Sequence, residues 1–550
     1  MQFHSAIPFA LAALAFGTSF PTSMALPDEG MWPFDALPLE KLKAEYNFEP
    51  TKEWLDHVRL GSVRFDTGGS GSFVSPNGLV MTNHHVALET IQKISTPEKD
   101  WVEPGFSSRL YGSEVPGTDL TVRQLVDVKD VTEEVMKLKA DGEVTEEQLA
   151  ELAATMSNED EHLVGDMVTL YDGNQYRIYV YHVYDDVRLV FAPAKQVAFY
   201  GGDFDNFTYP RWCLDCAFFR VYEDDKPVDS SKWFFEFEPA GAARGDLVFV
   251  SGHPGGTERA LTYEEMVMHR ELWTPQVVAL LENNVRVIKA RMEQSEEEAF
   301  RMRDTYFGQM NSLKAYSGHL AGLLDDEWMA KIKARDEELR EKAGSDELTA
   351  AFAAIKEAMD TLKAKHAGER INFGAMQRDM AETMKSVADH KSLINKARFE
   401  TYGNANYPDA TFSLRLAYGT VKGYEAGTTK VPYKTTVHGL FERNTSFDNQ
   451  APFDLPKQWL DAKDKLDMST PYNFVSTCDI IGGNSGSPIL DRNAKVVGLV
   501  FDGNIESLPG NYWFDPVVNR CVGVHTGIMV EALGKVYEEK DLLKELLGGK

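Results

Sequence analysis

Gly482-Gly483-Asn484-Ser485-Gly486-Ser487-Pro488 places a serine between glycines in a tight turn. The segments on either side, 472–477 and 495–501, have the apolar composition of β-strands. Glycine lets the backbone bend sharply and point its N–H groups at one place, as a nucleophilic serine beside an oxyanion hole requires. The same pattern also fits a glycine-rich β-turn that merely contains a serine. The rest of the chain has to decide between these two interpretations.

Two residues earlier in the chain are candidates to complete such a site. His85 follows the short apolar run 79–82, which predicts a buried strand, and a helical turn is expected after it. A histidine there is well placed as a general base, although a lone histidine is more often a structural residue. Asp215 lies near the end of the stretch 201–216, which is rich in loop-forming and aromatic residues. His85, Asp215 and Ser485 follow the order His, Asp, Ser of chymotrypsin-like proteases.

This order assigns a role to each residue. Ser485 attacks a carbonyl carbon, His85 takes the serine proton, and Asp215 fixes the imidazole tautomer and stabilises the imidazolium. The N–H groups of Gly483 and Ser485 bind the oxyanion. Loss of one oxyanion donor typically raises the barrier by about 3–4 kcal/mol, so the glycines matter chemically as well as sterically.

Composition limits the class of protein. With 550 residues, the chain is long enough for more than one folding unit. Its formal net charge of −28 argues against binding to nucleic-acid phosphates, which requires a basic surface. We therefore expect a soluble protein that does not bind nucleic acid.

The N-terminus has the pattern of an export signal. The run 7–17 is apolar, and Ser23-Met24-Ala25 is a small-x-small cleavage site, although no Lys or Arg precedes the run. We expect a signal peptide over 1–25 and a periplasmic, cell-surface or secreted protein; the alternative is an uncleaved N-terminus. No later stretch reaches the ~18 apolar residues of a membrane span.

The chain contains four cysteines. The Cys213-x-x-Cys216 spacing could indicate a redox motif or half of a metal site, but no second pair exists and no histidine lies at ligand spacing. We therefore predict no metal and no cofactor. Cys478 and Cys521 lie on strands expected to be antiparallel neighbours, so a disulfide between them is plausible. Cys213 and Cys216 would then pair locally or stay reduced.

The order of predicted elements is β-rich, helical, β-rich. Strand-like segments fill much of 26–256, including an expected hairpin at 176–192. Residues 257–400 are rich in Glu, Lys, Ala, Met and Leu at helical spacing, with almost no proline. Strand patterns return in 401–550, which ends in a predicted helix at 528–547. The fold class is therefore mixed β and α, with a long helical insertion between the candidate base and the candidate nucleophile.

Several blocks along the chain resemble the S46 family of serine peptidases, the exported dipeptidyl peptidases of bacteria. They keep the family's order and are GMWPFDALPL at 30–39, SPNGLVMTNHH at 75–85, GGDFDNFTYPR at 201–211, YPDATFSLRLAYGTVKGYE at 407–425, GGNSGSP at 482–488 and VGLVFDGN at 497–504. The resemblance implies a chymotrypsin-like double β-barrel, a helical domain that caps the active-site cleft, and commonly a homodimer. It selects His85 over His84, Asp215, and Ser485 over Ser487.

The resemblance also implies groups that hold the free α-amino group of the substrate. These match Asn206, Asp502 and, in the helical region, Asn311, with Phe207 at the position of the family's tryptophan. Gly503 matches a position in the S1 pocket; where an arginine stands there, members select acidic P1 residues, so glycine implies an open pocket and apolar or aromatic P1. Many members have cysteines at the positions of Ser70 and Val86, and the helical region of this chain is shorter than is typical.

These matches predict an exported exopeptidase that releases dipeptides from the free N-terminus of oligopeptides. The first alternative is an endopeptidase on the same fold, if the shortened cap leaves the cleft open. The second is a catalytically silent relative that only binds peptides, against which the complete set of candidate catalytic residues argues.

Overall fold

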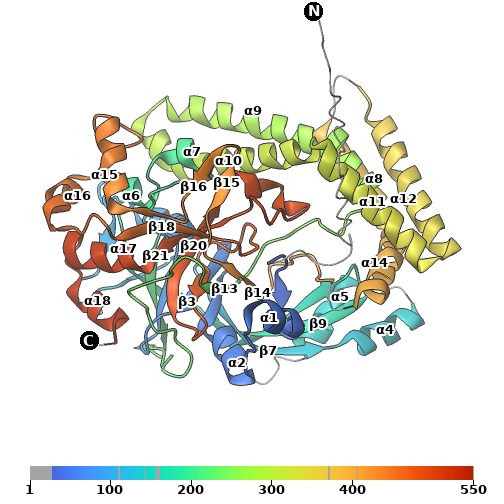
Figure 1. Cartoon of the computed structure of the whole chain (residues 1–550), viewed down its shortest axis with the longest axis horizontal. Coiled ribbons are helices and arrows are strands. Elements are labelled where there is room, and N and C mark those ends of the chain that lie inside the picture. Colours follow the sequence, from blue (N-terminus) through green and yellow to red (C-terminus); the bar gives the residue numbers. More distant parts are fainter. Residues whose placement is uncertain are drawn as a thin grey trace, which may run out of the picture.

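The computed structural model describes residues 28–109, 112–142, 144–155, 162–368, 372–403 and 406–548. The predicted signal peptide at 1–25 lies outside these residues. A β-rich body occupies one side of the molecule, and helices run across its top and down its right-hand side in the view of Figure 1. In the part of the chain that is described, no helix is long and apolar enough to cross a membrane.

An antiparallel sheet of 11 strands forms one part of the body. Its main path runs β5-β10-β11-β4-β3-β2-β7-β9-β8, with β12 paired to β11 and β6 paired to β10. The strands are β2 (Ser62–Phe65), β3 (Gly69–Phe73), β4 (Leu79–Thr82), β5 (Phe106–Ser107), β6 (Val115–Pro116), β7 (Val122–Asp130), β8 (Leu163–Leu170), β9 (Gln175–Tyr184), β10 (Asp186–Ala192), β11 (Ala217–Glu223) and β12 (Lys226–Pro227).

A second antiparallel sheet has eight strands in the order β1-β14-β13-β19-β20-β21-β18-β17. It contains β1 (Trp32–Pro33), β13 (Leu247–Gly252), β14 (Arg415–Thr420), β17 (Lys434–Thr436), β18 (Pro471–Ser476), β19 (Pro488–Leu490), β20 (Val496–Gly503) and β21 (Cys521–His525). A small hairpin joins β15 (Tyr424–Ala426) and β16 (Thr429–Val431). The candidate serine turn connects β18 to β19, in the middle of this sheet.

The helical region is inserted between two neighbouring strands. β13 and β14 pair from Leu247↔Thr420 to Gly252↔Arg415, and the chain leaves the sheet after the first and returns at the second. Between them lie α8 (Tyr263–Met268), α9 (Thr274–Met292), α10 (Glu296–Leu323), α11 (Asp326–Ala343), α12 (Asp346–Lys365), α13 (Phe373–Ser386) and α14 (Ala388–Tyr402). This agrees with the helical composition of 257–400.

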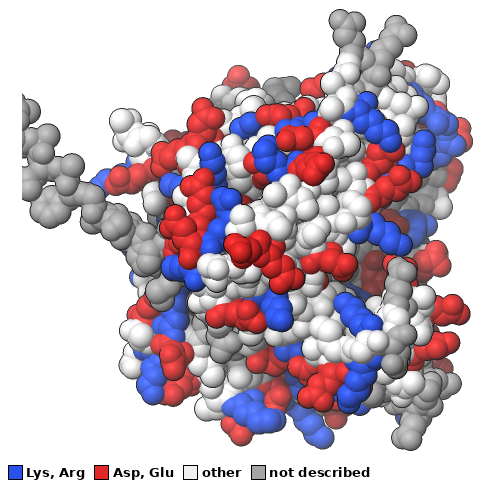
Figure 2. All heavy atoms as spheres, turned by 90° about the vertical axis from the view of Figure 1, so that its right-hand side faces the viewer, with Lys and Arg blue, Asp and Glu red and all other residues white. Residues whose placement is uncertain are grey.

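Side-chain caps and apolar faces explain these helices. Ser295, Asp325, Ser345 and Asn372 each accept a hydrogen bond from the backbone at the first turn of α10, α11, α12 and α13. The insertion has its own apolar core, which includes Met268, Leu272, Leu348, Phe352, Ile355 and Met376. On the face of the molecule formed by this region, Lys and Arg are interspersed with Asp and Glu (Figure 2).

The longest helix, α10, reaches back to the β-rich body. A Cβ at Gly318 would overlap the side chain of Leu508, and one at Gly322 would lie 2.7 Å from the Cβ of Pro509. The backbone of α10 therefore rests directly on the short helical segment η4 (Ile505–Asn511), which follows β20. This contact brings the insertion next to the end of β20, where Asp502 lies.

The remaining helices cover the edges of the body. They are α1 (Leu39–Tyr46), α2 (Lys52–Gly61), α3 (His84–Ile94), α4 (Thr132–Asp141), α5 (Glu146–Ala154), α6 (Lys195–Ala198), α7 (Gly202–Asp205), α15 (Val437–Ser446), α16 (Lys457–Ala462), α17 (Thr526–Glu531) and α18 (Lys540–Leu546). The single helix predicted at 528–547 is thus two helices, α17 and α18; the chain turns at 537–539, where Glu538 has a positive φ of 56°.

Two other expectations are wrong. Residues 176–192 form two strands, but β9 pairs with β7 and β8 while β10 pairs with β11, so they are not a hairpin. All four cysteines are free and buried. The register of β18 with β21 places Cys521 opposite Ser476, two residues before Cys478, and the predicted disulfide is not formed.

Candidate active site

His85 and Asp215 meet because two neighbouring strands end side by side. β4 and β11 are antiparallel, with Thr82 opposite Ala217, so the residues just after β4 lie next to those just before β11. The Nδ1 of His85 lies 2.6 Å from Oδ2 of Asp215, and the backbone N–H of His85 donates to Oδ1 at 3.1 Å. Asn83 adds a bond from its side-chain amide to the Asp215 carbonyl oxygen at 2.8 Å.

The two histidines of this segment differ in environment. The side chain of His85 is 45% exposed, whereas His84 is buried. Burial lowers the pKa of His84 to about 4, so it is neutral at physiological pH. Burial also acts to lower the pKa of His85, but the charge and the hydrogen bond of Asp215 outweigh it and raise the pKa above 6.5. Only His85 combines a carboxylate partner with access to solvent.

The serine turn is fixed to strand β3 of the other sheet. The backbone N–H of Ser70 donates to the carbonyl oxygen of Ser485 at 2.7 Å, and the Ser70 hydroxyl donates to that of Gly483 at 2.8 Å. A Cβ at Gly69 would lie 2.8 Å from Cγ2 of Val86 and 3.3 Å from the Ser485 carbonyl oxygen. Ser485 and the residue after His85 therefore flank the same glycine, which places the serine turn next to the segment that carries His85.

Two glycines of the turn have conformations and neighbours that exclude a side chain. Gly483 has φ +98° and Gly486 has φ +85°. A Cβ at Gly483 would lie 2.7 Å from the Gly255 nitrogen, and one at Gly486 would overlap the Ser70 carbonyl oxygen. The turn is close-packed on both sides, as a rigid site requires.

Three backbone N–H groups of the turn are left unused. Asn484 donates to Ile481, Gly486 to Val500 and Ser487 to Asn484. Within the described part of the chain, the N–H groups of Gly482, Gly483 and Ser485 have no acceptor. The amides of Gly483 and Ser485 are the two that the sequence assigns to an oxyanion hole. Ser485 is partly exposed, whereas Ser487 is fully buried with its hydroxyl 3.4 Å from the side-chain oxygen of Asn484.

The residues predicted to bind the substrate amino group form a second cluster. The side-chain amide of Asn206 donates to Oδ1 of Asn311 at 3.0 Å, which joins α7 to α10. The backbone N–H of Phe207, a residue with φ +54°, donates to Oδ2 of Asp502 at 3.0 Å. Asp502 also accepts the N–H of Gly503 at 2.9 Å. All four predicted residues thus meet where the insertion contacts the body.

Asp502 has a partner that the sequence did not predict. The guanidinium of Arg211 forms an ion pair with Oδ2 of Asp502, and the two side chains are 2% and 7% exposed. Arg211 also packs against the rings of Phe199 and Phe501. Burial raises the pKa of Asp502, while Arg211 and the two N–H donors oppose that rise. Arg211 is the last residue of the block at 201–211, and its position in that block is the sequence feature that could have identified it as part of the site.

The carboxylate cluster is coupled electrostatically to the histidine. The charge of Asp502 acts to raise the pKa of His85, and that of His85 acts to lower the pKa of Asp502. Because Coulomb interactions weaken with distance, this mutual effect agrees with a single site that contains both clusters.

Gly503 is in a more crowded position than the sequence suggested. It ends β20 opposite Cys521, and a Cβ added to it would overlap the hydroxyl of Ser507. That hydroxyl donates to the carbonyl oxygen of Asn504 at 2.7 Å. The hydroxyl of Ser507 therefore lies next to Gly503, and an open P1 pocket at this point stays a prediction.

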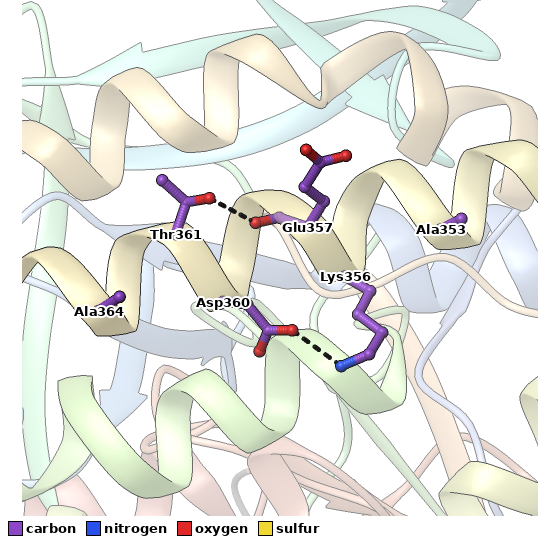
Figure 3. Close-up of a pocket in the computed structure, with 6 residues that line it drawn as sticks. All are labelled: Ala353, Lys356, Glu357, Asp360, Thr361 and Ala364. Carbon is purple, nitrogen blue, oxygen red and sulfur yellow. Dashed lines mark hydrogen bonds and ion pairs between the residues drawn. The ribbon is translucent and has the colours of Figure 1, made fainter.

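A surface hollow of about 460 Å³ lies elsewhere, on α12 of the insertion. Its lining includes Lys356, Asp360 and Thr361, and Figure 3 shows the Lys356–Asp360 ion pair and the bond from Thr361 to the Glu357 backbone along one helix. None of the predicted site residues lines it, so it is not the active site.

The family model that matches this chain is Peptidase S46, over residues 27–375 and 372–548. Dipeptidyl-peptidase 7 of Porphyromonas gingivalis is 26% identical and aligns with 97% of this chain and 98% of its own length. The Asp/Glu-specific dipeptidyl-peptidase of Shewanella putrefaciens is 24% identical over 96% and 98%. The first alignment spans 712 positions against the 550 residues of this chain, so this chain is the shorter of the two.

Solved structures agree in fold. A crystal structure of Porphyromonas endodontalis DPP11 in complex with the dipeptide Arg-Glu has a TM-score of 0.80 at 20% identity, and it covers 94% of this chain and 99% of its own. The structure of DPP11 in an alternate conformation has a TM-score of 0.66. The chain therefore belongs to the peptidase S46 family and is a hydrolase of peptide bonds.

Proposed function

We propose that this protein is a serine-type dipeptidyl peptidase that releases dipeptides from the free N-terminus of oligopeptides. The observation that carries the proposal is the joint placement of the His85–Asp215 pair, the unused N–H groups of Gly483 and Ser485 in the serine turn and the buried Asp502. The first two supply acyl-transfer chemistry. The third supplies a negative charge near the same site, which suits a substrate ammonium group.

The proposed reaction begins with Ser485. His85 takes the hydroxyl proton through the ring nitrogen that Asp215 does not hold, and the serine oxygen attacks the carbonyl carbon of the second residue. The N–H groups of Gly483 and Ser485 stabilise the oxyanion. His85 then gives the proton to the leaving amine. In the second half of the reaction His85 takes a proton from water, the water oxygen attacks the acyl carbon, and His85 returns the proton to the oxygen of Ser485.

The proposed length selection depends on the α-ammonium group of the substrate. Asp502 attracts it, while Asn206 and Asn311 offer amide oxygens and Phe207 contributes a wall. A group held at a fixed distance from Ser485 allows two residues between the ammonium and the attacked bond. Chains blocked at the N-terminus lose this contact and are expected to be poor substrates.

The proposal also concerns the residue accepted at P1, for which there are two candidates: an apolar or aromatic residue, or an acidic one. Glycine at 503 offers no cation, and an acidic P1 side chain left unpaired in a closed pocket costs free energy, which favours apolar or aromatic P1. Several relatives, however, are named Asp/Glu-specific, and the matched DPP11 complexes contain Arg-Glu and Arg-Asp. Values of kcat/KM for dipeptidyl-coumarin substrates that differ only in Leu or Asp at P1 decide between them.

Three further features belong to the same proposal. The two large sheets are the two β-barrels of a chymotrypsin-like peptidase, with the insertion as the cap over the cleft. The protein is exported and acts in the periplasm, at the cell surface or outside the cell. It forms a homodimer.

The decisive experiment follows the products of one peptide. A free hexapeptide, its N-acetylated twin and casein are digested, and the products are identified by mass spectrometry over time. We expect successive dipeptides from the free hexapeptide alone. Internal fragments of casein and of the acetylated peptide would instead support an endopeptidase, and absence of any product would support a protein that only binds peptides.

A further inference from the structure

A group of three metal-binding side chains lies at the opposite end of β11 from the candidate active site. His162, His182 and Glu223 place one possible ligand atom each within 4.8 Å of one another. Nε2 of His182 lies 2.6 Å from Oε1 of Glu223, and the rings of His162 and His182 stack at a centroid separation of 5.6 Å. The side chains of His182 and Glu223 are 21% and 38% exposed, so an ion can reach them from solvent.

The fold, not local sequence spacing, creates this group. His162 directly precedes β8, and its carbonyl oxygen accepts the N–H of Val183 on β9 at 2.8 Å. Glu223 ends β11, which lies five strands away from β9 in the order of the sheet. The chain passes from β9 straight into β10, and Asp186 at the start of β10 pairs with Tyr222. The end of β9 is thereby brought next to the end of β11.

The three groups suit one ion. Two imidazole nitrogens and one carboxylate oxygen are a ligand set that Zn²⁺ accepts, with a water molecule at the fourth position. Zinc bonds of about 2.0–2.1 Å place tetrahedral ligands about 3.4 Å apart, so the widest gap has to close by up to about 1.4 Å and the 2.6 Å gap between His182 and Glu223 has to open. Rotation of these partly exposed side chains makes both changes. The hydrogen on Nε2 of His182 moves to Nδ1 when Nε2 binds the ion, so the imidazole binds in its neutral form.

We propose that His162, His182 and Glu223 form a zinc site that ties the start of β8 and the end of β9 to the end of β11. Asp215 lies two residues before β11 and Glu223 ends it. Six residue steps from Ala217 to Glu223 at about 3.3 Å each separate the two ends by about 20 Å. The site is thus structural: it stabilises the sheet and takes no part in peptide hydrolysis.

The test uses the full protein after removal of metals with a chelator. Titration with Zn²⁺ is followed by calorimetry, and Tm is measured with and without the ion. We expect one saturable equivalent and a rise in Tm. His182→Ala and Glu223→Gln should each lose the saturable step and the rise in Tm, and His162→Ala should weaken the affinity at least tenfold.

A matched control is the exposed pair of His438 and Glu442, whose side-chain atoms lie 3.8 Å apart on α15. His438→Ala should leave the zinc titration unchanged. If His182→Ala does not fold, Glu223→Gln changes one atom of a partly exposed side chain and gives the same information. Saturable binding that persists in both variants, or wild-type protein without saturable binding, would overturn the proposal. Hydrolysis of peptides should be the same with and without the chelator.

Discussion

The two acidic groups of the candidate active site are equally buried, but their partners differ in exposure. Asp215 is 6% exposed and holds His85 by one ring nitrogen, and that ring remains 45% exposed to solvent. Asp502 is 7% exposed and already accepts the N–H groups of Phe207 and Gly503 and the guanidinium of Arg211. The carboxylate of the proposed catalytic pair thus orients an exposed imidazole, whereas the hydrogen-bonding capacity of the carboxylate proposed to bind the substrate is largely used within the protein.

This difference limits how a substrate ammonium can bind. An ionised carboxylate offers about four acceptor sites, and three donors already occupy Asp502. One site is left, so in the proposed function the ammonium joins the cluster as a fourth donor and does not displace Arg211. Arg211 opposes the rise in the pKa of Asp502 that burial causes, and a bound ammonium would add a second positive charge.

The largest effect on activity is expected when the candidate nucleophile, Ser485, is replaced. Ser485→Ala should lower kcat by several orders of magnitude, because members of such a triad act as a unit. The variant should still bind peptide, which fluorescence titration with a labelled peptide can check. Ser487→Ala is the control, since this buried serine packs within the turn; an inactive Ser487→Ala with an active Ser485→Ala would reverse the assignment.

Removing the charge of Arg211 next to Asp502 should lower the stability of the protein. Arg211→Met leaves Asp502 buried without its counter-charge, so we expect a loss of about 3–5 kcal/mol in the free energy of unfolding. Urea unfolding followed by tryptophan fluorescence measures it. Arg443→Met is the matched control, since Arg443 pairs with Asp205 but is 28% exposed. Equal losses in the two variants would show that burial of the Arg211–Asp502 pair does not increase the effect of its removal on the free energy of unfolding.

The pH dependence follows from the raised pKa of His85. The neutral imidazole is the base, so kcat/KM should rise with pH through a midpoint above 6.5 and change about tenfold per pH unit below it. While Asp215 is ionised, the stability that the raised pKa of His85 contributes is full below pH 6.5 and is lost as pH rises through the folded pKa; protonation of Asp215 at acid pH also removes it.

At higher pH a second limb is expected, because the substrate α-amino group loses its proton near pH 8 and with it the attraction to Asp502. Asp215→Asn should lower the first midpoint as well as the rate. A first midpoint below 6.5 in the wild type would contradict the role of Asp215 in raising the pKa of His85.

The smallest effect is expected at Ser70. Its hydroxyl donates to the Gly483 carbonyl oxygen and so helps to orient the unused amides of the serine turn. Ser70→Ala should lower kcat about fivefold with KM unchanged, since one hydrogen bond contributes about 1 kcal/mol. Ser72→Ala on the same strand is the control, because within the described residues the Ser72 hydroxyl has no partner. Equal kcat in the two variants would show that the Ser70 hydroxyl does not help to position the turn.

Much of this arrangement was within reach of the sequence. The candidate residues lie just outside predicted strands, and the helical composition of 257–400 located the insertion between β13 and β14. The pairing of strands was less accessible, because β9 and β10 are adjacent in sequence and yet pair with other strands. A shift of two residues along β21 was enough to separate Cys521 from Cys478.

The environment of individual side chains was the hardest part to predict. The contact between Arg211 and Asp502 joins residues 291 positions apart, and no local pattern marks it. Likewise, the hydroxyl of Ser507 fills the space at Gly503 because the chain turns into η4 directly after β20. The close placement of His162, His182 and Glu223 depends on the same kind of long-range folding.

The most direct test is a cycle of two enzymes and two substrates. Wild type and Asp502→Asn are each assayed for kcat/KM on one dipeptidyl-coumarin with a free N-terminus and on its N-acetylated form, with Tm measured to confirm folding. A charge-assisted hydrogen bond contributes about 1.5–3 kcal/mol, so Asp502→Asn should reduce the preference for the free substrate by about 10- to 150-fold. An unchanged preference in the variant would show that Asp502 does not bind the substrate ammonium.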